Sequence, residues 1–183
     1  MEIVSGSVFS DFVKQNIFIP IGMSNTFQPV SYEEYSVIPD YFEINSNGYY
    51  QTKKMPDPST ILGCGGIIST TKDLFLFSRA LHKSNFLSKN SYEKMTTPYS
   101  GLNSTDGYIF KTNYAYGLNV DNEITVNNIK RKTIWHSGSF ANGVSTLIVH
   151  FVDEDIDIII LENIRVYPSL EQHVIDAAGI LLK

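Results

Sequence analysis

Residues 145–161 read STLIVHFVDEDIDIIIL, and they carry the clearest structural signal in the chain. Two apolar runs, residues 145–151 and 156–161, have the length and the β-branched content of strands. Residues 152–155 between them are mostly polar and predict a tight turn. We therefore expect an antiparallel hairpin. The almost continuous apolar character of residues 156–161 is typical of a strand buried in the middle of a sheet.

Two further strands and a closing helix accompany this hairpin. Residues 114–120 and 132–135 are strand candidates, because aromatic and β-branched side chains are frequent there. Residues 168–183 predict an amphipathic helix with Pro168 near its first turn. The apolar stripe of that helix consists of Leu170, Val174, Ala177, Ala178 and Leu181.

The first half of the chain is predicted to be helical and irregular. A short helix with apolar residues at helical spacing follows an N-cap candidate at Ser7, and Pro20 and Gly22 are expected to end it. Residues 25–62 are rich in Pro, Tyr, Asn and Ser. They are predicted to be mostly irregular, with one short strand near residues 48–50.

Two more helices are predicted before the sheet. Thr70 or Thr71 caps the first, and Asp73 is favourable in its positive first turn. The buried stripe of this helix is expected to hold Leu74, Phe77 and Leu81. Ser88 caps the second helix, and Pro98 stops it. The whole pattern predicts a single α+β domain, with a helical and irregular part at residues 1–112 and a sheet with its C-terminal helix at residues 113–183.

Composition excludes several classes of protein. The chain has 183 residues, which is room for one ordinary domain, and 43% of them are hydrophobic, which excludes a disordered chain. A net charge of -5 argues against a general nucleic-acid binder. No apolar run approaches the roughly 20 residues of a membrane helix, so no membrane segment is expected. The one cysteine, Cys64, forms neither an internal disulfide nor a Cys-rich zinc site by itself.

Several segments, taken together and in order, resemble the C-terminal half of the serine β-lactamase-like family. The branch concerned includes class C β-lactamases, D-alanyl-D-alanine carboxypeptidases and related esterases. The resemblance covers nearly the whole chain and rests on the ordered set, since each piece alone is weak. The matching segments are Val4-Ser5-Gly6-Ser7-Val8-Phe9, Phe12-Val13, residues 17–23, Gly65-Gly66-Ile67-Ile68-Ser69-Thr70-Thr71-Lys72-Asp73-Leu74, Leu87-Ser88, Tyr92-Glu93-Lys94-Met95, Tyr116-Gly117-Leu118, His136-Ser137-Gly138, Gly143 and Leu161-Glu162-Asn163.

The resemblance implies that the triplet His136-Ser137-Gly138 lies on a strand edge beside an active site. It implies that His136 orients the substrate electrostatically and that Ser137 and Gly138 line the bound substrate, with Gly138 giving clearance. The backbone N–H of Ser139 would then be one oxyanion donor. Trp135 departs from the family pattern, and it either narrows the mouth of the site or packs. No metal site and no cofactor are implied.

The family's nucleophile lies in a Ser-x-x-Lys motif and its proton relay in a Tyr-x-Asn motif, both upstream of the stretch that matches here. No Tyr-x-Asn occurs in the 183 residues. Residues 69–72 and 91–94 fit Ser-x-x-Lys by letters, and residues 88–90 fit a Ser-x-Asn variant. All three fall where the family has structural helices or their caps. We therefore expect the chain to be a fragment of a serine hydrolase acting on amides, lactams or esters, and to be inactive alone.

Several alternatives stay open. The chain could instead be a non-catalytic module that binds a peptide or a partner at its strand edges, or an active hydrolase that uses a local Ser-x-x-Lys. Its enzymatic status is therefore undecided from sequence. Because a central strand needs two neighbours, we expect the chain to form a homo-oligomer or to pair with a complementing N-terminal fragment. The sequence leaves localisation undefined, although members of the resembled family are often extracytoplasmic.

Some residues are of the types found in metal or thiol sites, but their spacing in the sequence does not fit such a site. Asp153, Asp155 and Asp157 begin like a calcium loop, but the required Gly and Glu do not follow, so a solvated turn is predicted. His82, His150 and His173 share no metal spacing and are expected to be surface or packing residues. Cys64 has no neighbouring base in the sequence and is expected to be a buried or idle thiol.

Overall fold

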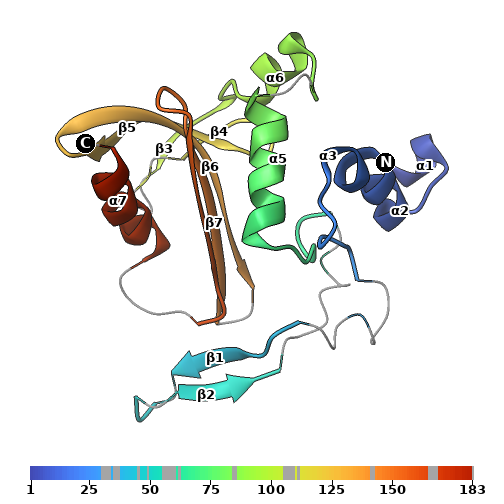
Figure 1. Ribbon diagram of the computed structural model, residues 1–183, viewed down its shortest axis with the longest axis horizontal. Helices are drawn as coiled ribbons and strands as arrows, with labels where there is room; N and C mark the ends of the chain where they lie inside the picture. The colour runs from blue at the N-terminus through green and yellow to red at the C-terminus, as the bar shows by residue number, and fades with distance from the viewer. Residues whose placement is uncertain are drawn as a thin grey trace.

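A computed structural model of the chain describes residues 1–29, 34, 38–44, 46–48, 50–54, 61, 63–83, 86–104, 110, 112–140, 143–164 and 169–182. Its main feature is a six-stranded antiparallel sheet with the order β3-β4-β5-β6-β7-β8, so strands that follow one another in sequence are neighbours in space (Figure 1). The strands are β3 Ser100–Ser104, β4 Thr112–Tyr114, β5 Asn119–Val126, β6 Ile129–Phe140, β7 Val144–Phe151 and β8 Ile156–Glu162.

The predicted hairpin is confirmed as β7 and β8, paired from Ser145↔Glu162 to Phe151↔Ile156. The turn between them contains Asp155 in the left-handed conformation, with φ 57°. Among the described strands β8 has β7 as its neighbour and stands at the end of the sheet. The second neighbour that its apolar sequence predicts is therefore not among the described strands.

The strand predicted at residues 114–120 is wrong as a single element. The chain turns between β4 and β5, and Gly117 takes a φ of 72° there, in the region that glycine tolerates without a steric penalty. The sheet also begins earlier than expected, because β3 lies before residue 113. The strand predicted at residues 132–135 is much longer, since β6 continues through His136 to Phe140.

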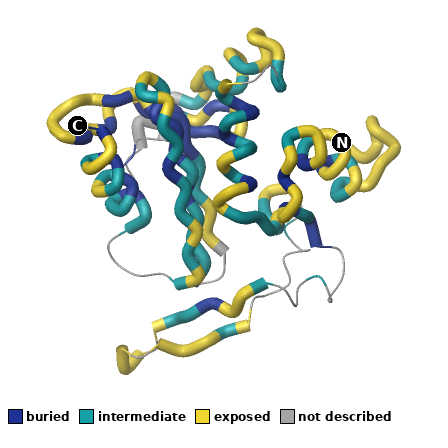
Figure 2. Tube along the Cα trace, in the orientation of Figure 1, coloured by how far each residue is buried: buried dark blue, intermediate teal, exposed yellow. Residues whose placement is uncertain are grey.

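Helices cover both faces of the sheet. Helix α7 (Leu170–Leu181) lies against one face, and α5 (Thr71–Lys83) with α6 (Lys89–Met95) lies against the other (Figure 1). The burial pattern in Figure 2 follows this layering, with the dark, buried segments concentrated where the helices meet the sheet. All three helices were predicted, and Ser88 caps α6 by accepting a hydrogen bond from the Ser91 amide at 3.1 Å.

Alternate residues of the central strands fill two apolar cores. Under α7 the buried core includes Trp135, Leu147, Val149, Phe151 and Val174. Under α5 and α6 it consists of Leu81, Ala115, Leu118, Val120 and Ile134. Because side chains of a strand point alternately to its two faces, Ile134 and Trp135 serve opposite cores. Trp135 therefore packs, with 1% of its surface exposed and its ring edge-on to Phe110.

Two details of the predicted helix stripes differ. Leu182, which follows α7, is buried, whereas Leu181 at the end of the helix is 59% exposed. In α5 Asp73, Ser78, Ala80 and Leu81 are buried, while Leu74 and Phe77 are half-buried. The buried polar residues of α5 make contacts that spacing alone does not reveal, as described below.

The N-terminal helical segment ends at Gly22, as predicted, but Pro20 lies inside its last helix. α1 (Glu2–Ser5), α2 (Phe9–Val13), the π-helical turn η1 (Lys14–Phe18) and α3 (Ile19–Ile21) follow one another. Pro20 lies in the first turn of α3, where a proline is tolerated, and Gly22 ends that helix with φ 79°. Ser7 is not the N-cap of α2. Val8 holds that position, and the carboxylate of Glu2 accepts from the Phe9 amide at 2.7 Å.

A two-stranded hairpin, β1 (Tyr41–Ile44) with β2 (Tyr50–Lys53), occupies part of the segment predicted to be irregular. It joins the end of β8, because the Phe42 amide donates to the Asn163 carbonyl at 2.8 Å. Gly143 is needed for this approach, since a Cβ there would lie 2.2 Å from a ring carbon of Tyr41. The short strand predicted near residues 48–50 overlaps β2 only at Tyr50, since Gly48 lies in a turn and residue 49 lies outside the described residues; β1 was missed.

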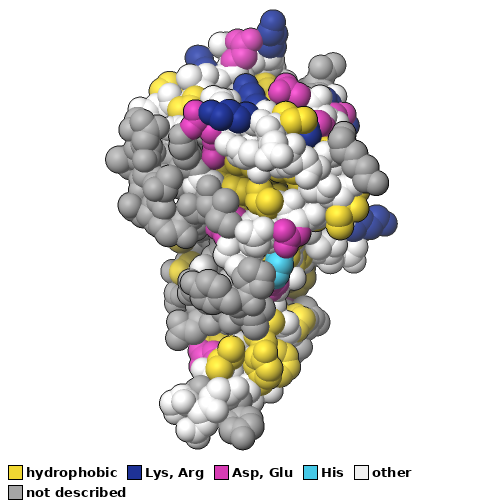
Figure 3. Space-filling model, turned by 90° about the vertical axis from the view of Figure 1, so that its left-hand side faces the viewer, with side chains coloured by type: hydrophobic (Ala, Val, Ile, Leu, Met, Phe, Trp, Pro, Cys, Tyr) yellow, Lys and Arg dark blue, Asp and Glu magenta, His cyan; other side chains and the backbone are white. Residues whose placement is uncertain are grey.

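Figure 3 views the side of the molecule that lies to the left in Figure 1. Acidic and basic side chains are interspersed on that face, with apolar side chains between them. Within the described part of the chain, no helix is long and apolar enough to cross a membrane.

The α7 core provides a direct stability test. We expect Leu147→Ala to lower the free energy of unfolding by about 2–5 kcal/mol, because Leu147 is 1% exposed and its removal leaves a cavity. Leu181→Ala removes the same side chain from an exposed site and should change stability by less than about 0.5 kcal/mol. Urea unfolding followed by circular dichroism measures both, and equal effects would contradict the burial of β7 beneath α7.

Candidate functional site

The candidate site is the part of β6 that extends beyond its partner β5. The β5–β6 ladder ends at Asn119↔Trp135, whereas the β6–β7 ladder continues to Phe140↔Val144. Among the described strands, none pairs with residues 136–140 on the side opposite β7. The segment that contains His136, Ser137, Gly138 and Ser139 therefore has one open edge.

The direction of the main-chain groups at this edge follows from the register. One pair beyond the end of β7, the Val152 amide donates to the Lys132 carbonyl at 3.0 Å. Antiparallel residues alternate in the side to which their N–H and C=O point, and the ladder has no register shift from residue 133 to residue 140. The main-chain groups of Ser137 and Ser139 therefore point away from β7, toward the open edge.

His136 has a partner that the sequence did not reveal. The Tyr114 hydroxyl lies 3.0 Å from His136 Nε2, and the two rings meet edge to face with centroids 5.9 Å apart. Tyr114 ends β4 and is 41% exposed. Sequence reasoning missed this pair because it assigned residues 114–120 to one straight strand, which would carry Tyr114 away from β6.

Gly138 faces its cross-strand neighbour. A Cβ at this position would lie 2.6 Å from Thr146 Oγ1, and Gly138 pairs directly with Thr146. A side chain at this position would therefore overpack against Thr146, besides reducing any clearance that a substrate would need. Ser137 is half-buried and Ser139 is exposed.

The two segments that match the Ser-x-x-Lys pattern, residues 69–72 and 91–94, lie at the starts of helices. The Ser69 hydroxyl lies 2.8 Å from Thr26 Oγ1, which also donates to the buried Asp73 carboxylate at 2.8 Å. Asp73 therefore anchors a loop as well as lying in the first turn of α5. Ser91 bonds to the capping hydroxyl of Ser88. Among the described hydrogen bonds, neither Ser69 nor Ser91 contacts a lysine side chain.

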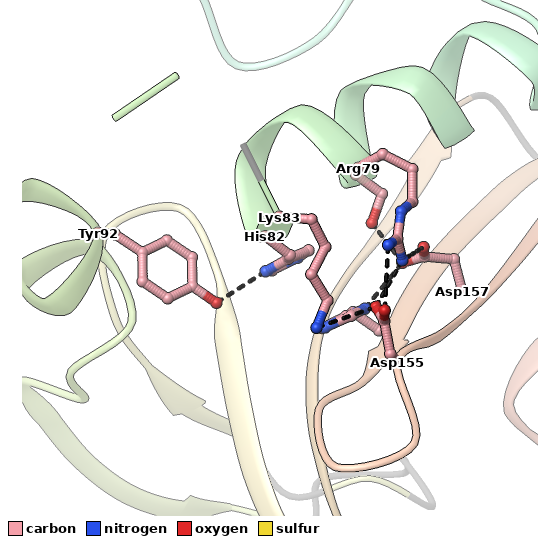
Figure 4. A network of polar contacts seen from close by, with 8 residues as sticks. Arg79, His82, Lys83, Tyr92, Asp155 and Asp157 are labelled. Atoms are coloured by element: carbon pink, nitrogen blue, oxygen red, sulfur yellow. Dashed lines mark hydrogen bonds and ion pairs between the residues drawn. The ribbon is translucent and has the colours of Figure 1, made fainter. Parts of the chain in front are cut away.

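A buried polar network ties α5 to the β7–β8 hairpin (Figure 4). Asp157 Oδ1 accepts from the Ser78 hydroxyl at 2.5 Å and lies 2.9 Å from His150 Nδ1. The His82 ring stacks on His150 with centroids 4.0 Å apart, and its Nδ1 lies 2.9 Å from the Tyr92 hydroxyl. At the outer end Arg79 makes two hydrogen bonds to Asp155, at 2.5 and 3.1 Å.

The network shifts the pKa values of its members. Burial, together with a smaller effect of the neighbouring His150, lowers the pKa of His82 to about 4. Burial alone would raise the pKa of Asp157, but hydrogen bonds from His150 and Ser78 outweigh it, so that pKa lies below its ordinary value. The hydrogen bonds from Arg79 lower the pKa of Asp155 to about 2.

These contacts explain the Asp and His residues whose sequence pattern resembles part of a metal site. Asp155 and Asp157 are engaged by Arg79, Ser78 and His150, and Asp157 is not the solvated turn residue that was expected. His82 and His150 are packing residues, as predicted, and His173 lies 3.3 Å from Glu162. In the described part of the chain no group of His, Cys, Asp and Glu could hold a metal ion. Cys64 is an exposed thiol, not a buried one.

Comparison with known proteins identifies the class. Residues 1–180 match the Beta-lactamase family, and the chain therefore belongs to that family. Over its whole length it is 28% identical to Penicillin-binding protein 4* of Bacillus subtilis (strain 168), and over 58% of its length it is 33% identical to the same organism's Putative penicillin-binding protein PbpX. The fold matches a crystal structure of a penicillin binding protein from Bacillus halodurans with a TM-score of 0.71 at 19% identity, over the whole of this chain.

The chain spans only part of each of these proteins. It covers 41% of Penicillin-binding protein 4*, 27% of PbpX and 51% of the Bacillus halodurans chain. The sequence-based interpretation as part of a penicillin-binding-protein or β-lactamase-like domain with an α+β fold is thus confirmed. The roles assigned to His136, Ser137, Gly138 and Ser139 stay predictions.

Gly138 and Thr146 can be tested as a pair. We expect Gly138→Ala to lower the free energy of unfolding by about 1–3 kcal/mol, because the added methyl group overpacks against Thr146 Oγ1. In the double variant with Thr146→Ala most of that loss should disappear, since the clashing hydroxyl is gone. A double-mutant cycle by urea unfolding measures the coupling, and purely additive effects would contradict the contact.

His82 makes the stability dependent on pH. Its pKa is about 4 when folded and 6.5 ordinarily, so the unfolded chain binds the proton first as the pH falls. The stabilising contribution of neutral His82 is fully present above pH 6.5 and is lost as the pH falls toward 4. The total loss should reach about 3 kcal/mol, at 1.36 kcal/mol for each pKa unit.

Urea unfolding between pH 7.5 and 4.5 measures this dependence. In His82→Phe, which retains a ring to stack on His150, the slope should become shallower. A wild-type stability that stays constant over this range would contradict the burial of a neutral His82.

Proposed function

We propose that this chain supplies the substrate-binding edge of an acyl-transferring serine hydrolase and is catalytically silent by itself. The open edge of β6 carries the proposal, because Ser137 and Ser139 point their main-chain groups away from β7 there. An extended acyl-amide, lactam or ester substrate would join this edge as an added strand. The Ser139 amide would donate to the oxygen of the attacked carbonyl, and His136 would orient the substrate beside it.

The nucleophile in this proposal comes from a Ser-x-x-Lys motif outside the 183 residues. The serine oxygen would attack the carbonyl carbon of the substrate and give its proton to the lysine. The bond to the leaving nitrogen or oxygen would break, and that atom would receive a proton through the tyrosine of Tyr-x-Asn. Water would then hydrolyse the acyl-serine ester. A fixed amide at the oxyanion would contribute roughly 3 kcal/mol to the transition state.

The proposal also assigns a partner to β8. Its outer edge has no neighbouring strand within the described part of the chain, and its residues are mostly apolar. Such an edge pairs readily with another strand. Because this chain covers about half of the proteins it matches, we favour a complementing N-terminal fragment over a second copy.

A fluorescent penicillin tests both parts of the proposal, since the matched proteins are named for binding penicillin. The chain alone should acquire no covalent label. Co-expressed with an N-terminal half that carries Ser-x-x-Lys and Tyr-x-Asn, it should form a complex in which that half becomes labelled. His136→Ala in this chain should slow the labelling of the complex at least tenfold, whereas Ser69→Ala and Ser91→Ala should leave it unchanged.

The opposite outcomes are equally informative. Labelling of the isolated chain that Ser69→Ala abolishes would mean that the chain is an enzyme by itself. A complex that labels no faster than the N-terminal half alone would reject the catalytic role of the β6 edge. The non-catalytic module that binds a peptide or a partner would then be the better description.

A further inference from the structure

Tyr114 lies outside the residues to which the resemblance gives a role in the site, yet it makes the hydrogen bond to His136 Nε2 at 3.0 Å. We propose that Tyr114 is a positioning residue for His136. Its hydroxyl donates to Nε2 and holds the neutral imidazole in the form that carries its proton on Nδ1. The part of this inference that concerns a ligand rests on the proposed function, whereas the tautomer itself does not.

The direction of the bond follows from the two groups. An imidazole nitrogen is far more basic than a phenol oxygen, so the favourable arrangement has the phenol as donor and the nitrogen as acceptor. A neutral histidine carries one proton on its two ring nitrogens. If Nε2 accepts from Tyr114, the proton is on Nδ1.

The main chain of Tyr114 is held in place by its neighbours. The Tyr114 carbonyl accepts from the Tyr99 amide at 3.0 Å, and Tyr114 pairs with Asn119 across the β4–β5 turn. In that turn the Ala115 amide donates to the Leu118 carbonyl at 2.7 Å, and both side chains are buried under α5. The turn thus holds Tyr114 from both sides, and the edge-to-face contact of the rings limits rotation of the imidazole.

The tautomer decides what His136 offers to a ligand. Nδ1 makes no hydrogen bond to any described residue, and the side chain is half-buried beside the open edge of β6. With its proton on Nδ1, His136 has a hydrogen-bond donor that no described residue accepts. A ligand at this edge would then be recognised through an acceptor, such as the oxygen of a carbonyl or carboxylate group. In the other tautomer His136 would favour a ligand that donates.

Long-range ¹H–¹⁵N NMR of the histidine rings at pH 8 measures the tautomer directly. The His136 signals are assigned by their loss in His136→Gln. We expect a protonated Nδ1 and an unprotonated Nε2 in the wild-type chain. In Tyr114→Phe, which keeps the ring and loses the hydroxyl, the Nδ1-protonated form should lose its dominance. Tyr116→Phe is the matched control, because Tyr116 stacks on Tyr99 through its ring, and it should leave the His136 signals unchanged.

Either of two results would overturn the inference. One is a wild-type His136 protonated on Nε2, and this result needs no variant to fold. The other is a Tyr114→Phe variant whose methyl spectrum remains native and whose His136 tautomer is unchanged, as a merely structural role for Tyr114 would give. Neither readout depends on a nucleophile. Failure of penicillin labelling together with a Tyr114-dependent tautomer would therefore reject the proposed function and leave this inference standing.

Discussion

The antiparallel ladder between β6 and β7 is the constraint on which the other parts of the structure depend. It runs from Thr133↔Phe151 to Phe140↔Val144 without a register shift. A slip of one residue would exchange the two faces of β6, bringing Trp135 out of the α7 core and turning His136 into it. The same register directs the main-chain groups of Ser137 and Ser139 toward the open edge. The register of β6 therefore sets both the burial of the core and the geometry of the candidate site.

The helix on the other face is fixed by polar contacts as well as by apolar packing. α5 contributes Leu81 to the core, and it also places Ser78 and His82 against Asp157 and His150 of the hairpin. The buried carboxylate of Asp157 is tolerated there because two hydrogen bonds to Oδ1 and the Arg79 guanidinium 3.5 Å from Oδ2 replace its water. The hairpin and α5 are thus held in one relative orientation. Hydrogen bonds define that orientation more strictly than apolar packing alone would. Asp157 consequently has a structural role, although its sequence neighbours suggested a solvated turn.

The candidate site combines a strand edge with a side chain from a distant turn. His136 and the Ser139 amide come from β6, and Tyr114 reaches His136 from the end of β4. The chain belongs to the Beta-lactamase family but spans roughly half of the proteins it matches. In the proposed division of labour the described residues bind and orient the acyl group, and the covalent chemistry belongs to residues elsewhere. Tyr114 has a third, indirect role, because it orients His136 and does not contact the substrate.

The sequence by itself determined the hairpin of β7 and β8 and the helices α5, α6 and α7, because apolar runs, turn residues and helix caps are local signals. The order of the motifs along the chain determined the family. The turn at Gly117 and the pairing of β1 with β2 were not predicted. A flexible glycine and a polar segment are each compatible with several conformations, and only packing selects among them. The pairing of Tyr114 with His136, the burial of Asp157 and the open edge beyond Trp135 depend on which strands end beside which. Those contacts join residues far apart in the chain, and the tertiary structure alone decided them.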